Sequence, residues 1–226
     1  MTSDLWIAQR LVDLYAGGTG FDYYDPGKGP SGICWASQRS EDVTDIFLRG
    51  SATFWDWVKD LMLLPAPWEH DTLGLIQPGF ALGMDRCWAA IKANTIGPWR
   101  LHGHSLGAAR ADILAGLMLE EGIAPLGLVL FGEPKPGFQK LADYIASVPR
   151  HSYRNGNPTG LRGHDLVTDY PILASPPRYV HPSKLIDVSA VPDLKVDLEY
   201  GIFRFHHLPL YVEALGKYEP ATSPRP

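Results

Sequence analysis

The residues GHSLG at positions 103–107 have the spacing G-x-S-x-G. A short strand-like run, 99–102, precedes them, and the apolar run over 105–121 is typical of a helix. Glycines at both ends of the motif allow a strand-to-helix turn in which side chains would clash. Such a turn exposes the serine hydroxyl and directs backbone N–H groups and the positive end of the helix at a developing oxyanion. The pattern therefore predicts that Ser105 is a nucleophile for acyl transfer.

A serine nucleophile needs partners elsewhere in the chain. Its hydroxyl is a weak nucleophile near neutral pH, so a histidine base and an acid that orients this base are required. Where the serine lies on this kind of turn, the chain order is serine, then Asp or Glu, then histidine. The partners are therefore expected after residue 105, which excludes His70, His102 and Asp60.

The elements that must position these residues alternate between strand and helix. The runs 99–102, 105–121 and 126–131 form a βαβ unit, which implies parallel strand pairing. The other expected elements are helices over 6–15, 53–64, 80–96 (with Leu82 on its apolar side) and 208–215, and strands over 33–37, 43–48, 151–155 and 177–189. The fold class predicted is α/β: an α/β-hydrolase fold with a mostly parallel central sheet and helices on both faces.

Length and composition limit the protein class. The chain has 226 residues, of which 45% are hydrophobic and 20% charged, enough for one α/β domain with a full core. We expect a single domain over 1–226, with residues 216–226 as a frayed tail. The net charge of −5 provides no basic field, so nucleic acid is not an expected partner.

The chain carries few targeting or cofactor signals. Its N-terminus lacks the features of a signal peptide, and no run approaches the 18 apolar residues of a transmembrane segment. We expect a cytoplasmic protein with reduced Cys34 and Cys87; a trimmed form of a secreted protein is the alternative. No cofactor is expected, and no metal, because His102 and His104 have no evident third ligand.

Separated motifs over residues 43–215 resemble the class 3 lipases, a fungal, plant and bacterial group of triacylglycerol lipases and related esterases. The matching segments are IFLRGS at 46–51, DW at 56–57 with DL at 60–61, GHSLGAA at 103–109, FGEPKPG at 131–137, and HDLV at 164–167 with Pro171. They resemble the family's oxyanion strand, the segment after it, the serine turn, the next strand end and the acid-bearing segment.

The resemblance implies the acid and the base. Asp165 matches the family's acid in register with Val167 and Pro171, and Asp169 is the alternative. The segment HHLPLY at 206–211 contains the base. A register similar to bacterial members makes His206 the base, whereas a fungal-like register makes it His207.

The resemblance also implies an oxyanion hole and a substrate pocket. The backbone N–H groups of Leu106 and Ser51 are the expected oxyanion donors. Phe54 and Trp55 are expected to bind substrate. In the family, the region at 54–64 supplies a lid that exposes apolar surface to lipid; the alternative is a helix that packs on the core.

The expected function is a serine carboxylic ester hydrolase, a lipase or esterase with a Ser-Asp-His triad and an acyl-enzyme intermediate. Its partners would be acylglycerols or short- to medium-chain esters, with transient contact at a lipid interface as a further possibility. A catalytically silent, lipase-like binding protein is the alternative. The short chain leaves little room for an elaborate lid, which favours plain esterase behaviour.

Overall fold

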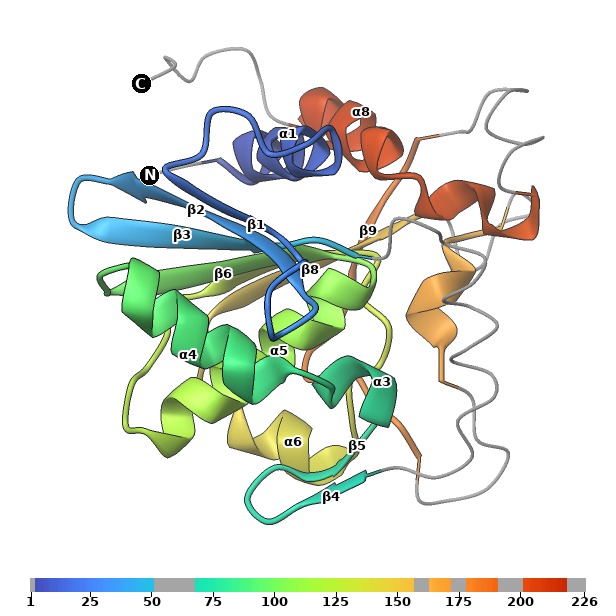
Figure 1. The fold of residues 1–226 in the computed structure, drawn as a ribbon. Helices are drawn as coiled ribbons and strands as arrows, with labels where there is room; N and C mark the ends of the chain where they lie inside the picture. Colours follow the sequence, from blue (N-terminus) through green and yellow to red (C-terminus); the bar gives the residue numbers. More distant parts are fainter. Residues whose placement is uncertain (1–2, 51–67, 157–162, 172–177, 191–200, 219–226) are drawn as a thin grey trace.

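A computed structural model describes residues 3–50, 68–156, 163–171, 178–190 and 201–218 of the chain (Figure 1). A seven-stranded sheet with the order β1-β2-β3-β6-β7-β8-β9 lies at its centre. The strands are β1 (Tyr23–Pro26), β2 (Cys34–Ser40), β3 (Val43–Leu48), β6 (Trp99–His104), β7 (Leu128–Phe131), β8 (Arg150–Asn155) and β9 (Ile186–Val188), with a separate hairpin of β4 (Trp68–His70) and β5 (Gly74–Ile76). The first two pairings are antiparallel and the four from β3 to β9 are parallel.

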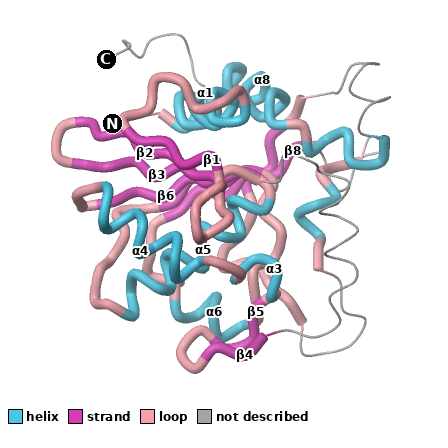
Figure 2. Tube along the Cα trace, viewed as in Figure 1, coloured by secondary structure: helices cyan, strands magenta, loops and turns pink. Residues whose placement is uncertain are grey.

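Helices cover both faces of this sheet, as Figure 2 shows by colour. On one face, α1 and α8 lie side by side, and the other face carries α4 and α5 with α3 and α6 (Figure 1). The helices are α1 (Asp4–Tyr15), α3 (Pro78–Ala81), α4 (Met84–Asn94), α5 (Leu106–Glu120), α6 (Gln139–Tyr144) and α8 (Leu208–Tyr218), with 3-10 helices η1 (Leu166–Asp169) and η2 (Gly201–His206). The mostly parallel sheet with helices on both faces confirms the predicted architecture.

Two apolar layers hold the helices to the sheet. The layer around α5 is formed by α4, α5 and one face of the sheet, and α5 is buried along nearly its whole length. The second layer joins α1 and α8 to the opposite face of the sheet. Cys34 belongs to the α1/α8 layer and Cys87 to the α5 layer, so the sheet separates these two free thiols.

The helix expected over 80–96 is interrupted. It forms two helices, α3 and α4, because Gly83 adopts a left-handed conformation with φ of 82°. A Cβ at this position would lie 2.1 Å from the carbonyl oxygen of Ser31. The break turns Leu82 outward to 76% exposure, so its expected place on an apolar helix face was wrong.

Other element boundaries also differ from the sequence-based expectation. The loop expected before residue 31 contains β1, an edge strand that ends at Pro26, where a missing N–H costs the sheet little. Of the strand expected over 177–189, the described residues 178–189 form β9 and an isolated bridge at Val180. Helix α8 continues to Tyr218, past the expected start of the tail. The helix expected over 53–64 lies outside the described residues.

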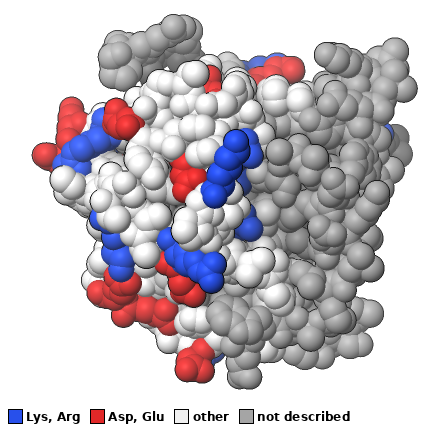
Figure 3. Space-filling model, viewed as in Figure 1, with Lys and Arg blue, Asp and Glu red and all other residues white. Residues whose placement is uncertain are grey.

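Charge is mixed on the face seen in Figure 3. Acidic and basic side chains are interspersed over its described part, without a broad basic patch. Among the described residues, no helix combines the length and the apolar character needed to cross a membrane.

Candidate active site

Ser105 lies in the tight turn between β6 and α5, as the sequence predicted. Its φ of 60° is unusual for a residue with a side chain, and such conformations cost about 1–3 kcal/mol unless the surroundings hold them. The Ser105 N–H donates to the Phe131 carbonyl oxygen at 3.0 Å. A Cβ on Gly103 would lie 2.3 Å from the carbonyl oxygen of Gly107. The two glycines therefore permit the turn that presents the serine.

Asp165 is fully buried at the start of η1. Its Oδ1 accepts the N–H of Val167 at 2.9 Å, and its Oδ2 lies 2.7 Å from Nδ1 of His206 and 2.5 Å from the hydroxyl of Tyr211. Burial alone would raise the pKa of Asp165. The His206 charge and these hydrogen bonds outweigh burial and hold the pKa below its ordinary value. Asp165 is therefore a carboxylate near neutral pH.

His206 ends η2 and is only 2% exposed. Because a carboxylate can only accept, Nδ1 of His206 carries the hydrogen that points at Asp165. In the neutral imidazole, Nε2 then carries the lone pair. This is the tautomer that a general base for a serine hydroxyl requires.

The neighbouring histidine lies differently. His207 precedes α8, is half-buried, and its carbonyl oxygen accepts the N–H of Leu210 at 3.0 Å. Asp165 is paired with His206, and not with His207. The structure thus brings together the acid and base expected from the bacterial-like register.

Two other acids after Ser105, Asp169 and Glu133, have other partners. Asp169, the alternative acid, lies 2.8 Å from Nε2 of His164 and is partly exposed. Glu133 is buried, accepts the hydroxyl of Ser152 and faces Nδ1 of His181 at 3.6 Å. Burial raises the pKa of Glu133, but the His181 contact and further hydrogen bonds lower it to about 2.

Gly132, directly after β7, joins the serine turn to the Asp–His pair. Its φ is 56°, and a Cβ here would lie 2.7 Å from both Oδ2 of Asp165 and Nδ1 of His206. The preceding residue, Phe131, accepts the N–H of Ser105. The serine turn and the Asp165–His206 pair therefore both border residues 131–132 at the carboxyl end of β7, and the glycine leaves room for the Asp165 and His206 side chains.

Sequence reasoning gave no structural role to two residues that hold the acid and the base. The Tyr211 hydroxyl donates to Asp165 and accepts the N–H of Asn155 at 3.2 Å. Nδ2 of Asn155 donates to the carbonyl oxygen of Phe205 at 3.2 Å, which fixes the segment before His206. A tyrosine on the apolar face of α8 was the available signal, because a buried phenol needs a hydrogen-bond partner.

One of the two expected oxyanion donors is described. Leu106 is the first residue of α5, where helix geometry provides no acceptor within the helix for its N–H. Ser51, Phe54 and Trp55 lie outside the described residues. Gly50, just before Ser51, is buried against the serine, because a Cβ on it would lie 2.9 Å from Cβ of Ser105. The strand end that leads to Ser51 is thus next to the nucleophile.

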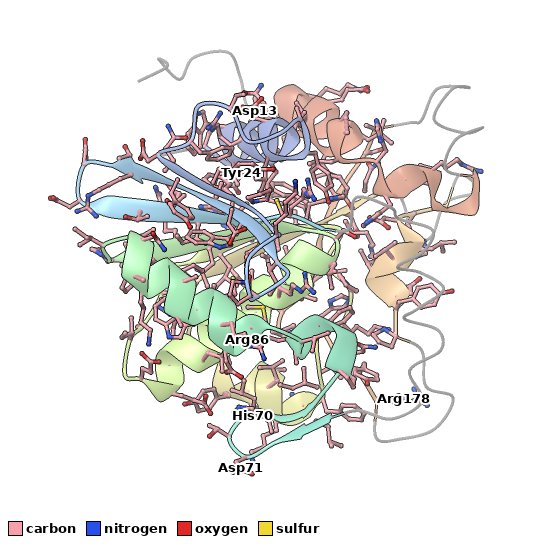
Figure 4. The ribbon with its side chains drawn as sticks, viewed as in Figure 1. Asp13, Tyr24, His70, Asp71, Arg86 and Arg178 are labelled. Carbon is pink, nitrogen blue, oxygen red and sulfur yellow. The ribbon has the colours of Figure 1, made fainter. Side chains whose placement is uncertain are left out.

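The remaining histidines near β6 have protein partners. Nε2 of His102 lies 2.8 Å from Oδ1 of Asp45, and Nδ1 of His104 lies 2.9 Å from the hydroxyl of Tyr15. In the described part of the chain, no three His, Cys, Asp or Glu residues form a group that could hold a metal ion. His70 lies on the β4–β5 hairpin, on the side of the sheet away from α1 and α8 (Figure 4).

The parallel sheet, the strained serine turn and the Asp–His pair at its strand ends define an α/β-hydrolase. The family model of the class 3 lipases matches residues 46–174, from β3 past the acid. The chain belongs to this family, as the sequence motifs predicted, and it is a carboxylic ester hydrolase. The match ends before His206.

Several solved lipase structures are similar to this one. Rhizomucor miehei triacylglyceride lipase is 18% identical with a TM-score of 0.59, over 82% of this chain and 77% of its own. A triacylglycerol lipase from Penicillium expansum is 19% identical with a TM-score of 0.55, over 83% and 79%. A triacylglycerol lipase whose catalytic centre is described as a serine protease triad is 22% identical with a TM-score of 0.51, over 67% and 60%. At these identities, the likeness shows the fold. No curated protein matches the sequence.

Proposed function

We propose that the protein hydrolyses short- to medium-chain carboxylic esters, including acylglycerols, with Ser105 as nucleophile, His206 as base and Asp165 as the acid that orients it. The 2.7 Å pair between Asp165 and His206, beside the serine turn, is the observation that carries the proposal. A neighbour of the same fold has a catalytic centre described as a serine protease triad, which supports the same arrangement here.

The proposed reaction has two steps. Nε2 of His206 takes the Ser105 proton as Oγ attacks the ester carbonyl carbon, and the imidazolium faces the Asp165 carboxylate. The N–H groups of Leu106 and Ser51 stabilise the oxyanion of the tetrahedral intermediate. Its collapse breaks the ester C–O bond, and His206 returns the proton to the leaving alcohol. Water then attacks the acyl-serine in the same way and releases the carboxylic acid.

Labelling with a fluorophosphonate separates this proposal from a catalytically silent, lipase-like protein. The reagent forms a covalent bond only with an activated serine, because it needs the nucleophile, the base and the oxyanion donors together. We expect stoichiometric labelling at Ser105, detected by mass spectrometry of the digested protein. A folded protein that takes up no label would favour the silent alternative.

Asp165→Asn should lower kcat by about 10⁴-fold and leave KM nearly unchanged. An amide at this position can donate to Nδ1 of His206 and thereby favour the tautomer whose Nε2 carries the hydrogen. Steady-state kinetics with a soluble nitrophenyl ester measure this change. Asp169→Asn is the matched control, since Asp169 is partly exposed and paired with His164, and its kcat should stay near that of the parent. If Asp169→Asn is instead the damaging change, the acid is assigned to the wrong residue.

Kinetics across the substrate solubility limit separate an esterase from an interfacially activated lipase. A lid must expose an apolar face that is unfavourable in water and favourable on lipid. In the helix that the sequence predicts for residues 54–64, three charges would share one stripe, Pro65 and Pro67 follow it, and we expect the apolar face to be needed by the core. We therefore expect hyperbolic kinetics on nitrophenyl esters from short to medium acyl chains. A jump in rate at the solubility limit, lost when Trp55 and Leu63 are made polar, would identify a lid instead.

A further inference from the structure

Tyr15, the last residue of α1, contacts the active site from a part of the chain that the sequence motifs leave out. Its hydroxyl lies 2.9 Å from Nδ1 of His104 and accepts the N–H of Gly50 at 3.0 Å. The Tyr15 ring meets the His104 ring edge to face, with centroids 5.6 Å apart. His104 in turn lies between Tyr15 and the base, since Nε2 of His104 is 3.0 Å from the carbonyl oxygen of His206.

The donor of each hydrogen bond in this series, from Gly50 through Tyr15 and His104 to His206, can be assigned. A carbonyl oxygen only accepts, so Nε2 of His104 carries the hydrogen that points at His206. Burial first, and then the charge of His206, lowers the pKa of His104 well below its ordinary value, so the ring is neutral. Nδ1 of the neutral ring is an acceptor, and Tyr15 donates to it. The Tyr15 oxygen is then left to accept from Gly50.

These bonds join the three loops that the proposed reaction uses. Gly50 precedes Ser51, the proposed second oxyanion donor, and His104 precedes Ser105. The carbonyl oxygen at the other end belongs to His206, whose ring also stacks on that of His104 with centroids 4.6 Å apart. Each bond is therefore within one residue of a group that touches the reacting atoms, and among the described residues the Tyr15 hydroxyl reaches the site through His104 and Gly50.

We propose that Tyr15 and His104 act as positioning residues that hold the oxyanion loop and the base loop in register with Ser105. The inference rests on the proposed function, because it assigns these residues to the same site. Small misplacements of catalytic groups cost far more in rate than in substrate binding, with about 10²-fold lost for a shift of about 1 Å. Loss of the Tyr15 hydroxyl should thus lower kcat and spare KM.

Tyr15→Phe removes the hydroxyl and keeps the ring. In the full chain, we expect kcat on a soluble nitrophenyl ester to fall by about 10- to 100-fold. KM should change little, and fluorophosphonate labelling should slow in parallel with kcat. Tyr153→Phe is the matched control: its hydroxyl donates to Asp4 at 2.6 Å, at the opposite end of α1. It should unfold at a similarly lowered temperature but keep the parent kcat. Equal kcat values in the two variants would overturn the inference.

A double-mutant cycle with His104→Gln tests whether Tyr15 acts through His104. A glutamine Nε2 can still donate to the His206 carbonyl oxygen, but the side chain has no acceptor at the place of Nδ1. We expect Tyr15→Phe to lower kcat less in this background than in the parent, because the bond from Gly50 is then the one that remains to be lost. Fully independent losses would multiply and contradict the relay. Ser105→Ala separates the two proposals. If it retains activity, the proposed function fails; if it is inactive while Tyr15→Phe matches Tyr153→Phe, only the positioning role fails.

Discussion

Replacing Ser105 by alanine is expected to abolish both ester hydrolysis and fluorophosphonate labelling. The change removes only the hydroxyl oxygen and the bond that it would form with the acyl group, and it leaves the Asp165–His206 pair in place. Loss of the nucleophile of a triad lowers kcat by about 10⁶-fold. Hydrolysis of a soluble nitrophenyl ester, measured against buffer alone, provides the range needed to detect this loss.

The backbone at Ser105 makes the alanine variant a clean test. Alanine and serine both carry a Cβ, so the strain at a φ of 60° is the same in the two proteins. Ser37→Ala, which removes a buried hydroxyl from β2 in the antiparallel part of the sheet, is the control for loss of a buried serine and should retain full activity. Activity of Ser105→Ala above about a hundredth of the parent would contradict the assignment, since triad knockouts lose far more.

The paired histidines should respond in opposite ways. His206→Ala removes the imidazole that faces Asp165 and is expected to lower kcat by several orders of magnitude, about 10⁶-fold for a complete loss of the base. His207→Ala leaves the acid–base pair intact and should keep kcat within a few-fold of the parent. Parallel kinetics of the two variants on one soluble ester measure the difference. The reverse pattern would move the base by one residue.

The thermal stability of His206→Ala and His207→Ala must be measured together with their activity. Without His206, the donors left to the buried Asp165 carboxylate among the described residues are Tyr211 and Val167, so the protein should unfold at a lower temperature or take up a proton at Asp165. Circular dichroism during thermal unfolding therefore has to show that His206→Ala is folded at the assay temperature. If His206→Ala is folded but inactive, its loss of activity is due to removal of the catalytic base and not to unfolding.

The sequence made the serine turn predictable because its requirements are local. Gly103 and Gly107 stand two residues from Ser105, and the strand and helix that flank them are continuous with the motif. The mostly parallel sheet followed from the same βαβ unit. The assignment of Asp165 as acid and His206 as base came instead from the resemblance to a family, because chain order alone leaves Asp169 and His207 as alternatives.

Features that depend on contacts between distant segments were not predictable. Tyr15 and His104 are 89 residues apart, and neither has a local pattern that indicates the other. Asn155 and Tyr211 meet Asp165 only after β8 and α8 are packed on the sheet. Gly83 interrupts a helix that periodicity alone would continue, and the close approach of the carbonyl oxygen of Ser31, a residue distant in the sequence, is not visible in the local pattern.

The packing of α1 against α8 has a consequence for attaching this enzyme to a solid support. Tyr15 ends α1, and His206 and Tyr211 border or belong to α8, so the helices near the two ends of the chain support the active site. A tether at either end would pull on these helices. The opposite side of the sheet offers better anchoring points, because Asp71 on the β4–β5 turn and Arg86 on α4 are both exposed there (Figure 4). If the immobilised enzyme is linked through this side, the tether should not pull on the loops that carry Ser105 and His206.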